Sequence, residues 1–349
     1  MAEMMKALRL HGPHDLRLEE MPRPTAGPGE VVVHIAAAGI CWTDIELYKG
    51  IHGALLRGLR EYPFTPGHEW SGHVVEVGEG VGHLQAGDLV VGETGIGCLR
   101  CELCLAGHHQ LCPEGSETGI VRRDGAMREY HVQNADFVHR FPGGGDPVVA
   151  ALTEPASVGV YACRRTGVSP LDRVAIVGGG TIGQCSLQAA RAFGARQLVM
   201  VSRSLPKLAL AEQYGADAVI NSRETDLLAA ATELTDGALF DVVVEAAGTE
   251  AAFRDALVIG GYVSRIALVG LSSAEPFGYG LETIINREQT IQGLRGSPHV
   301  YPQTIQMIET GVLQLAPLLT HRFAFEDYAA AFALAERGGP DVLKVALTL

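Results

Sequence analysis

The sequence predicts an α/β protein of two domains, and three observations lead to that prediction. The chain has 349 residues, of which 47% are apolar and 19% charged, and at about 150 residues per domain this is enough for two buried cores. Residues 1–140 are rich in β-branched segments bounded by Gly or Pro. After residue 147, short Val/Ile runs alternate with Ala-rich helical stretches, which predicts a doubly wound parallel sheet covered by helices on both faces.

The domain boundary is expected at residues 141–147, a segment dominated by Gly and Pro. Residues 1–147 and 296–349 are expected to form the β-rich domain, and residues 148–295 the parallel-sheet domain. In the first domain we expect strands at 30–36, 71–77 and 342–347, the last returning from the far end of the chain. In the second we expect strands at 173–177, 197–202, 241–245 and 263–269, and helices at 182–193 and 205–214.

The net charge of the chain limits which class of molecule it is expected to bind. Lys and Arg number 27 against 40 Asp and Glu, a formal net charge of -13, which repels nucleic acid and anionic membranes. No 18 uncharged apolar residues run together and the N-terminal residues lack a secretory pattern, so we expect a cytoplasmic protein with a small-molecule partner. In that compartment the 7 cysteines are expected to be metal ligands or buried thiols.

A glycine motif follows the expected strand 173–177 and opens the expected helix 182–193. Its glycines allow a tight turn and close approach of the backbone to a pyrophosphate, while the helix N-terminus faces the phosphate charge. This context predicts a nicotinamide dinucleotide site and makes a turn that binds nothing the weaker interpretation. The residues expected to bind the cofactor here are Gly178, Gly180, Thr181, Ile182 and Gly183.

The end of the second expected strand selects between the two nicotinamide cofactors. An NAD site usually has Asp or Glu there, and this chain has Ser202. Arg203 and Lys207 follow, and their charges suit a 2′-phosphate. NADP is therefore expected in preference to NAD, the alternative being that Arg203 is a solvated loop residue.

Four cysteines fall within 15 residues, spaced Cys-x2-Cys-x2-Cys-x7-Cys. They are Cys98, Cys101, Cys104 and Cys112. Four thiolates make a closed tetrahedral zinc site, which is structural because no coordination position is left for substrate. An iron–sulfur cluster is the alternative.

A second, mixed set of possible metal ligands is spread along the first domain. It comprises Cys41, His68, Glu69 and Glu154. A thiolate, an imidazole and a carboxylate leave one position open for water or a substrate oxygen, as a catalytic zinc requires. Each residue alone is as readily a core or surface residue, so the assignment depends on the surrounding sequence.

These surrounding sequences resemble the zinc-dependent medium-chain alcohol dehydrogenases over essentially the whole chain. The shared motifs, in that family's order and spacing, are Gly39-Ile-Cys41-Trp-Thr43-Asp44, Pro66-Gly67-His68-Glu69, the four cysteines, Glu154-Pro155 and the glycine motif. Glu154 stands where the primary-alcohol enzymes have a second cysteine. In this respect the chain is similar to the sorbitol, threonine and related polyol or cyclitol dehydrogenases.

The resemblance implies a GroES-like β-rich catalytic domain and a Rossmann domain. It also implies two zinc ions per chain and hydride transfer between a nicotinamide cofactor and a secondary alcohol, namely a polyol, sugar, cyclitol or aminocyclitol, giving a ketone. Cys41 and His68 would ligate the catalytic zinc, with Glu69, Glu154 or both in turn. Relatives are homo-oligomers, so a dimer or tetramer is implied.

Further roles are carried over residue by residue. Thr43 would accept the proton of the bound alcohol, Asp44 would orient a metal ligand, and Lys344 would bind the cofactor pyrophosphate. Glu46 stands where many relatives have a relay histidine, so either Glu46 or His52 would complete the proton relay.

Two features are left open by the resemblance. The Phe-Arg pair of polyol relatives is absent in that form; Arg295 would face substrate or cofactor, or serve as a structural loop residue. Polar and aromatic residues after the first motif are expected either to line the substrate cleft or to lie on a solvated insertion. They are Trp42, Tyr48, His52, Arg57 and Arg60.

Two other functions are compatible with parts of the sequence. One is a dehydrogenase or reductase of simple primary alcohols and aldehydes, which the missing cysteine at position 154 disfavours. The other is a catalytically silent binding protein, which the retention of Cys41, Thr43, His68 and Glu154 together disfavours.

Overall fold

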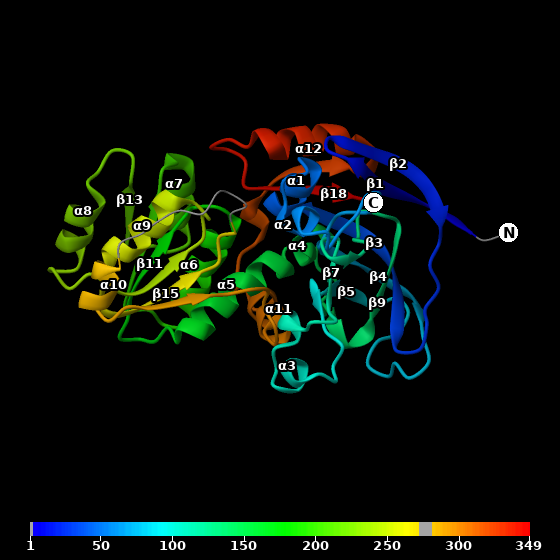
Figure 1. The fold of residues 1–349 in the computed structure, drawn as a ribbon, viewed down its shortest axis with the longest axis horizontal. Helices are drawn as coiled ribbons and strands as arrows, with labels where there is room; N and C mark the ends of the chain where they lie inside the picture. The colour runs from blue at the N-terminus through cyan, green and yellow to red at the C-terminus, as the bar shows by residue number, and fades with distance from the viewer. Residues whose placement is uncertain (1–2, 272–280) are drawn as a thin grey trace. The chain divides into compact units, whose positions relative to one another are not determined.

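The chain folds into two compact units in a computed structural model that describes residues 3–271 and 281–349 (Figure 1). The first unit comprises the chain up to Glu154 together with Gly296–Glu309 and Leu315–Leu349, and the second comprises Pro155–Arg295 and Thr310–Gln314. The expected boundary at 147/148 differs from this division by one short helix, and Thr310–Gln314, expected in the first domain, belongs to the second unit. That helix, α4 (Pro147–Ala151), packs against β3 and β4 of the first unit.

The first unit is built on a seven-stranded sheet with the order β10-β5-β4-β3-β18-β17, in which β9 also pairs with β3. Its strands are β3 (Glu30–Ile40), β4 (Glu69–Val77), β5 (Leu89–Gly92), β9 (Tyr130–Asn134), β10 (Val138–Arg140), β17 (Leu319–Ala324) and β18 (Lys344–Thr348). β18 lies antiparallel to β3 with Val345 opposite Ile40. The prediction that the last strand returns to the first domain is therefore confirmed.

β3 contributes side chains to more than one core cluster of this unit. Val31, Val33 and Ile35 point into a cluster with Trp70. After a register shift between Ile35 and Ala37, Ala38 and Ile40 belong to a second cluster, beneath α12 (Tyr328–Arg337). The shift re-aims the end of β3 just before the first metal-binding motif.

Smaller elements complete the first unit. The remaining strands are β1 (Met4–Gly12), β2 (Asp15–Pro22), β6 (Gly95–Ile96), β7 (Ser116–Thr118) and β8 (Arg122–Arg123). The helices are α1 (Trp42–Tyr48), α2 (Gly53–Leu56), α3 (Glu102–Leu105) and α11 (Tyr301–Glu309), with short 3₁₀ turns η1 (His109–Leu111), η2 (Ala135–Phe137), η3 (Ala316–Leu318) and η4 (Phe325–Asp327). α5 (Thr153–Thr166) begins in this unit and continues into the second.

The second unit contains a six-stranded parallel sheet with the order β13-β12-β11-β14-β15-β16. Its strands are β11 (Arg173–Val177), β12 (Gln197–Ser202), β13 (Ala218–Asn221), β14 (Phe240–Glu245), β15 (Gly260–Leu268) and β16 (Thr290–Gly293). In chain order this is 3-2-1-4-5-6, the order of dinucleotide-binding doubly wound sheets. The expected fold class is confirmed.

Helices cover this sheet in two groups. α6 (Thr181–Ala192) and α7 (Leu205–Gln213) pack on each other and on the β11–β13 side. α9 (Glu250–Ile259) packs on β14 and β15 and contacts α8 (Leu227–Leu234) and α10 (Glu282–Asn286). The strands and helices predicted for this unit are confirmed to within a few residues, whereas β13, α8, α9, α10 and β16 were not predicted.

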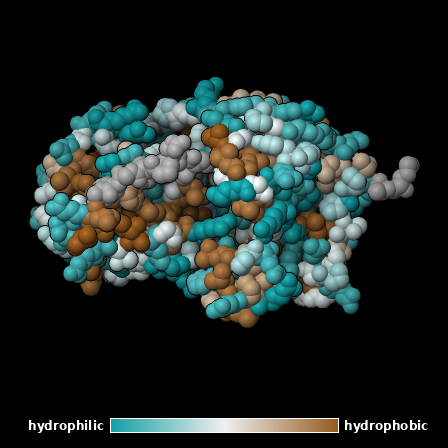
Figure 2. Space-filling model, viewed as in Figure 1, coloured by the Kyte–Doolittle hydropathy of each residue, from teal (hydrophilic) through white to brown (hydrophobic). Residues whose placement is uncertain are grey.

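The surface carries local apolar areas (Figure 2). Hydrophobic side chains gather over α10, where Leu281 and Ile285 are exposed, and over α3, where Leu105 is exposed. Across the described ranges 3–271 and 281–349, no helix combines the length and apolar character needed to cross a bilayer.

Candidate active site and metal centres

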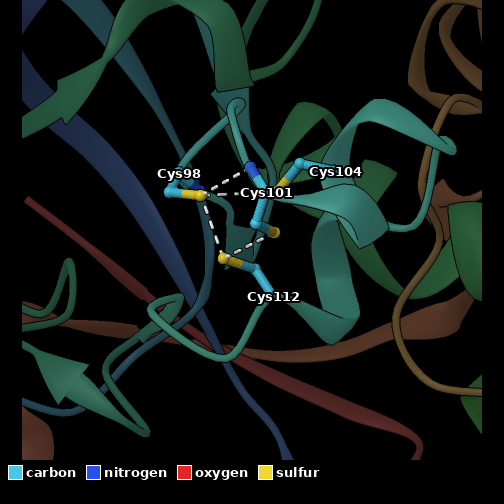
Figure 3. Close-up of side chains that lie close together, drawn as sticks. All are labelled: Cys98, Cys101, Cys104 and Cys112. Atoms are coloured by element: carbon cyan, nitrogen blue, oxygen red, sulfur yellow. Dashed lines mark hydrogen bonds between the residues drawn. The ribbon is translucent and has the colours of Figure 1, made fainter.

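Four cysteines of the first unit converge around α3 and η1 (Figure 3). The sulfurs of Cys98 and Cys104 are 4.0 Å apart, those of Cys101 and Cys112 are 3.8 Å apart, and all four lie within 4.8 Å of one another. Tetrahedral zinc with bonds of about 2.3 Å holds its sulfurs about 3.8 Å apart. The four thiols that the spacing predicted therefore fit a closed structural zinc site.

The local backbone shapes this cluster. A Cβ at Gly97 would lie 2.8 Å from Cys104 Sγ, so the close approach of the chain there requires glycine. Backbone N–H groups of Arg100 and Cys101 favour the thiolate of Cys98 and lower its pKa to about 6. A coordinated metal ion would complete the deprotonation of the set.

The second candidate metal centre lies where β3 ends beside the start of β4. Gly39 pairs with Glu69 across the two strands, which brings Cys41, just beyond β3, next to His68. One donor atom from each of Cys41, His68 and Glu69 lies within 4.8 Å of the others. His68 is buried; its Nδ1 lies 3.6 Å from Asp44 Oδ1 and has no hydrogen-bond partner among the described residues. Three dissimilar donors with a fourth position open suit a catalytic zinc ion.

Asp44 joins the two segments that carry these donors. Its Oδ2 accepts a hydrogen bond from the Cys41 N–H at 2.9 Å, and its Oδ1 accepts one from the Gly67 N–H at 3.0 Å. Burial by itself would lower the pKa of His68, but the neighbouring Asp44 and Cys41 raise it well above its ordinary value. Asp44 is itself fully buried, so it holds both segments in a fixed geometry.

Lys344 lies in a different environment from the one its expected role requires. Its Nζ donates to both carboxylate oxygens of Glu69, at 2.6 and 2.8 Å, and only 5% of the residue is exposed. Burial by itself would lower the pKa of Lys344, but Glu69 and Cys41 raise it. The ammonium expected on the cofactor pyrophosphate is therefore buried against a metal donor, because β18 runs beside the end of β3.

Glu154 stands next to the donor set. It lies in the first turn of α5, is partly buried, and its Oε1 accepts a hydrogen bond from Thr94 Oγ1 at 3.0 Å. Burial raises the pKa of Glu154, the His68 charge opposes that rise, and Glu69 adds to it. Among the described residues the compact donor group is Cys41, His68 and Glu69, with Glu154 as its neighbour.

A polar pocket opens beside Glu154, within the first unit. It is lined by Glu93, Thr94, Gly95, His109, Gln110, Glu154, Gly296, Ser297, Pro298 and Tyr301. In its wall, Glu93 Oε2 binds His109 Nε2 at 2.8 Å and Glu93 Oε1 binds His139 Nε2 at 2.9 Å. The sequence analysis missed these residues because they match no motif, and His109 and Gln110 were merely spacers between the third and fourth cysteines.

Two residues predicted for proton transfer follow the first motif. Glu46 is buried in α1, and the backbone N–H groups of Ile51 and His52 donate to its carbonyl oxygen. His52 precedes α2, where its Nδ1 accepts from the Ala54 N–H at 3.2 Å. Burial lowers the pKa of His52 and the nearby Glu46 opposes that change. Thr43 lies between these groups and Cys41 in the chain.

Other residues expected at the substrate cleft have different contacts. Tyr48 packs its ring 5.3 Å from Phe332. Arg60 Nη2 binds Asp124 Oδ1 at 2.6 Å, so this guanidinium belongs to a structural ion-pair network. Trp42 and Arg57 are exposed on the same unit.

The glycine motif of the second unit forms the turn between β11 and α6. Gly178 has φ +114°, a conformation that favours glycine, and Gly180 caps the helix that begins at Thr181. A Cβ at Gly183 would lie 1.8 Å from the Gly178 carbonyl oxygen. Gly178 and Gly183 therefore have a conformational or steric reason, whereas a Cβ at Gly180 would meet open space. The N–H groups at the start of α6, including that of Ile182, suit a phosphate.

The end of β12 is next to this turn. A Cβ at Gly179 would approach Ser202 Oγ to 2.9 Å and Lys207 Cβ to 3.0 Å. Lys207 is half-buried in α7, and burial lowers its pKa. Arg203 and Arg295 are exposed, the former after β12 and the latter after β16. Within this turn the structure brings together Ser202 and Lys207.

Comparison with known proteins gives two matching family models. They are the alcohol dehydrogenase GroES-like domain over residues 27–143 and the zinc-binding dehydrogenase over residues 181–310. The first match lies in the unit that carries the four cysteines and the donor group of Cys41, His68 and Glu69. The second lies mostly in the unit that carries the glycine turn between β11 and α6.

Individual relatives match along nearly the whole chain. The sorbitol dehydrogenase of Bacillus subtilis (strain 168) is 33% identical over 98% of this chain and 96% of its own. The L-idonate 5-dehydrogenase of Vitis vinifera is 34% identical over 97% of this chain and 93% of its own. A crystal structure of a Sinorhizobium meliloti 1021 protein bound to NADP superposes with a TM-score of 0.91 at 28% identity, covering 99% and 100% of the two chains.

Proposed function

Because this chain belongs to the zinc-binding dehydrogenase family, we propose that it oxidises a secondary alcohol of the polyol, sugar or cyclitol class to a ketone. The resemblance that the motifs indicated is confirmed, and so is the prediction of a zinc-dependent, NAD(P)-dependent enzyme acting on CH–OH donors. The sorbitol and L-idonate dehydrogenases among the relatives support the substrate class.

The observation that carries the proposal is the mixed donor group of Cys41, His68 and Glu69 beside a polar pocket. A zinc ion held there would act as a Lewis acid that lowers the pKa of an alcohol hydroxyl. We propose two zinc ions per chain, the second in the four-cysteine site. The carboxylate ligand would come from Glu69, from Glu154 or from both in turn, because the Glu154 carboxyl is near that of Glu69.

The proton of the alcohol needs a path through side chains of this unit. Thr43 would take it first, the role that the resemblance to the zinc-dependent family implies. From there either Glu46 or His52 would pass it outward, since the two lie close together and His52 is partly exposed. A bound nicotinamide cofactor would supply the acceptor for the hydride of the alcohol carbon.

We propose NADP as the preferred cofactor. Ser202 at the end of β12 provides no carboxylate for a ribose 2′-hydroxyl, and Lys207 is next to it at the glycine turn. The positive charges of Arg203 and Arg295 would attract the cofactor phosphates. The buried Lys344 forms an ion pair with Glu69.

A homo-oligomer is proposed as the working form. β16 is the outer strand of its sheet, and apolar residues of that side are exposed, including Tyr262, Val263 and Ile285. An open strand edge beside exposed apolar surface favours association with a second copy.

The test is an initial-rate survey of zinc-loaded protein with NADP⁺ and NAD⁺ offered separately. Sorbitol, myo-inositol, threonine and ethanol cover the candidate substrate classes. A clear rate with a polyhydroxylated secondary alcohol and NADP⁺ is expected, with two zinc ions per chain by elemental analysis. Preference for ethanol would contradict the substrate class, and preference for NAD⁺ would contradict the cofactor proposal alone.

A matched pair of variants tests the metal assignment. Cys41→Ser is expected to hold one zinc ion and to lose turnover, because it removes a donor from the mixed group. Cys163→Ala, at a buried thiol outside both groups, is expected to keep two zinc ions and full activity. Undiminished turnover in Cys41→Ser would refute the zinc mechanism.

A further inference from the structure

α6 carries a buried polar side chain directly after the last glycine of its motif. This residue, Gln184, is the fourth of the helix and has no solvent exposure. Its Nε2 donates to the Gly179 carbonyl oxygen at 3.3 Å and to the Lys207 carbonyl oxygen at 2.7 Å. Because an amide nitrogen carries two hydrogens, this one side chain can join the glycine turn to the first turn of α7.

The two segments that Gln184 joins are in close contact with each other and with the end of β12. A Cβ at Gly179 would lie 2.9 Å from Ser202 Oγ and 3.0 Å from Lys207 Cβ. Ser202 Oγ in turn accepts a hydrogen bond from the Ser204 N–H at 3.3 Å, just before α7 begins. The glycine turn, the end of β12 and the start of α7 therefore form one packed group, and the Gln184 amide bonds across it.

Lys207 brings a positive charge into this group without a counter-charge. The residue is half-buried, and burial is the cause that lowers its pKa. Within residues 3–271 and 281–349 no carboxylate forms an ion pair with it. A partly buried ammonium group is unfavourable unless an anion neutralises it. A phosphate beside Ser202 would supply that anion, because the strand end there carries no carboxylate of its own.

A second buried glutamine of the same helix shows what is unusual about Gln184. Gln188 uses both ends of its amide on one residue: its Oε1 accepts from the Gln314 N–H at 2.7 Å, and its Nε2 donates to the Gln314 carbonyl at 3.4 Å. Gln184 Oε1 is buried and has no hydrogen-bond partner among the described residues, which is costly. The contribution of Gln184 to this group therefore comes from the two bonds of its nitrogen.

We infer that Gln184 is a positioning residue that fixes the start of α7 against the glycine turn, so that the Lys207 ammonium meets the 2′-phosphate of NADP. The inference rests on the proposed function, since it concerns the proposed preference for NADP. Gln184 acts through Lys207 and contacts no atom of the cofactor. Without its two bonds the charge on α7 is held less closely, whereas the N–H groups at the start of α6 still face the pyrophosphate. Loss of Gln184 therefore weakens NADP binding and leaves NAD binding nearly unchanged.

The test is calorimetric titration of NADP⁺ and NAD⁺ into the zinc-loaded wild type and Gln184→Leu. Leucine keeps the approximate volume and removes both donors. We expect the Kd for NADP⁺ to rise about tenfold and the Kd for NAD⁺ to change less than twofold. Gln188→Leu also breaks two buried hydrogen bonds of α6, so it is expected to lower stability while the ratio of the two Kd values stays the same. Equal weakening of both nucleotides in Gln184→Leu would overturn the inference.

A double variant tests whether Gln184 acts through Lys207. Lys207→Met alone is expected to weaken NADP⁺ binding about tenfold, because it removes the charge. Adding Gln184→Leu is then expected to weaken it less than twofold further, since no charge is left to position. Fully additive losses would contradict the positioning role. If Gln184→Leu does not fold, Gln184→Asn replaces it, because it keeps the amide but shortens its reach; an unchanged Kd ratio in that variant overturns the inference.

Failure of the proposed function is distinguishable from failure of this inference. Tighter binding of NAD⁺ than of NADP⁺ by the wild type would contradict the NADP proposal, and absence of alcohol turnover would contradict the proposed reaction. Neither result decides the role of Gln184, because the coupling between Gln184 and Lys207 is measured on NADP⁺ binding alone. Additive losses in the double variant would overturn the inference in either case, and non-additive losses would support it.

Discussion

The absence of a side chain at Gly39 allows β3 and β4 to approach each other at the metal donors. A Cβ there would lie 2.1 Å from Glu69 Oε2, well inside van der Waals contact. Glu69 in turn holds Lys344, so one methyl group would disturb both a donor and its ion-pair partner.

Gly39→Ala is therefore expected to lower the unfolding free energy by about 1–3 kcal/mol and to reduce zinc content from two ions per chain towards one. Denaturant unfolding and elemental analysis measure the two effects. Gly82→Ala is the matched control, because nothing lies within 4 Å of a Cβ at that glycine. Two zinc ions and normal stability in Gly39→Ala would contradict the steric argument.

His131 makes the stability of the first unit depend on pH. It is fully buried, with Nδ1 2.9 Å from Arg128 Nη2 and Nε2 3.1 Å from Gln133 Oε1, contacts that suit the neutral ring. Burial and the Arg128 charge hold the pKa of His131 well below its ordinary value. Below about pH 6.5 the unfolded chain therefore binds a proton that the folded chain does not, and stability falls as pH falls.

The expected contribution is about 1.4 kcal/mol per pH unit between pH 6.5 and 5. Urea unfolding followed by Trp fluorescence measures it in this unit, because both tryptophans, Trp42 and Trp70, lie there. His131→Gln is expected to be less stable at pH 7 but to show a correspondingly shallower pH dependence. An unchanged slope would exclude His131 as the source.

At the scale of elements, the segment leading to His68 is held by a carboxylate from another loop. Asp124 accepts hydrogen bonds from Arg9 Nη1 at 2.8 Å, Arg60 Nη2 at 2.6 Å and the Thr65 N–H at 3.1 Å. Residues 125–127 then pair their backbone with residues 65–67. The position of His68 therefore depends on contacts far from the metal donors.

Asp124→Asn is expected to lower the unfolding free energy by about 2 kcal/mol, because it leaves two partly buried guanidinium groups without their counter-charge. Zinc affinity of the mixed site should fall with it, as competition with a chelator would measure. Asp15→Asn breaks an exposed ion pair with Arg17 and is expected to leave the unfolding free energy nearly unchanged, because solvent screens that pair. Equal effects of the two variants would contradict a special role for Asp124.

At the scale of the whole molecule, the exposed apolar side of the second sheet predicts self-association. The double variant Tyr262→Asp and Ile285→Asp places charges beside the outer strand β16 and is expected to shift the protein towards monomer. Light scattering after size-exclusion chromatography measures the mass. Leu228→Asp, at an exposed leucine of α8, should leave the mass unchanged. An unaltered oligomer in the double variant would place the interface elsewhere.

The order of elements was predictable where local signals agree. β11, the glycine turn and α6 follow one another within 20 residues, so periodicity and glycine chemistry identified them together. The four-cysteine site was predictable because donor type and spacing carry the chemistry. The mixed group of Cys41, His68 and Glu69 was predictable only through the resemblance of the surrounding motifs to a known family. Their exact partners were not: Lys344 meets Glu69 across 275 positions, and only the pairing of β18 with β3 brings them together.

The residues around the expected substrate site were harder to predict from the sequence, because they too are brought together only by tertiary contacts. Glu93, His109 and His139 come from three separate segments and form one hydrogen-bonded group. None of the three lies in a sequence motif that indicates this contact. Arg60 and Tyr48 matched a cleft-lining pattern, yet tertiary contacts placed one on Asp124 and the other on Phe332. The sequence showed that these side chains are polar, but the direction in which each one points depends on tertiary packing.

The division of the first unit into three chain segments has a consequence for biosynthesis. A ribosome delivers β3 and Cys41 early, but Lys344, whose Nζ contacts the Ile40 carbonyl, comes 304 positions later. The second unit is nearly continuous and can complete its sheet before then, because domains fold as units while long-range strand pairing is slow. Cys41 and His68 are therefore exposed to cellular zinc before Lys344, the counter-charge for Glu69, has been synthesised. A zinc ion can reach these donors before the chain leaves the ribosome.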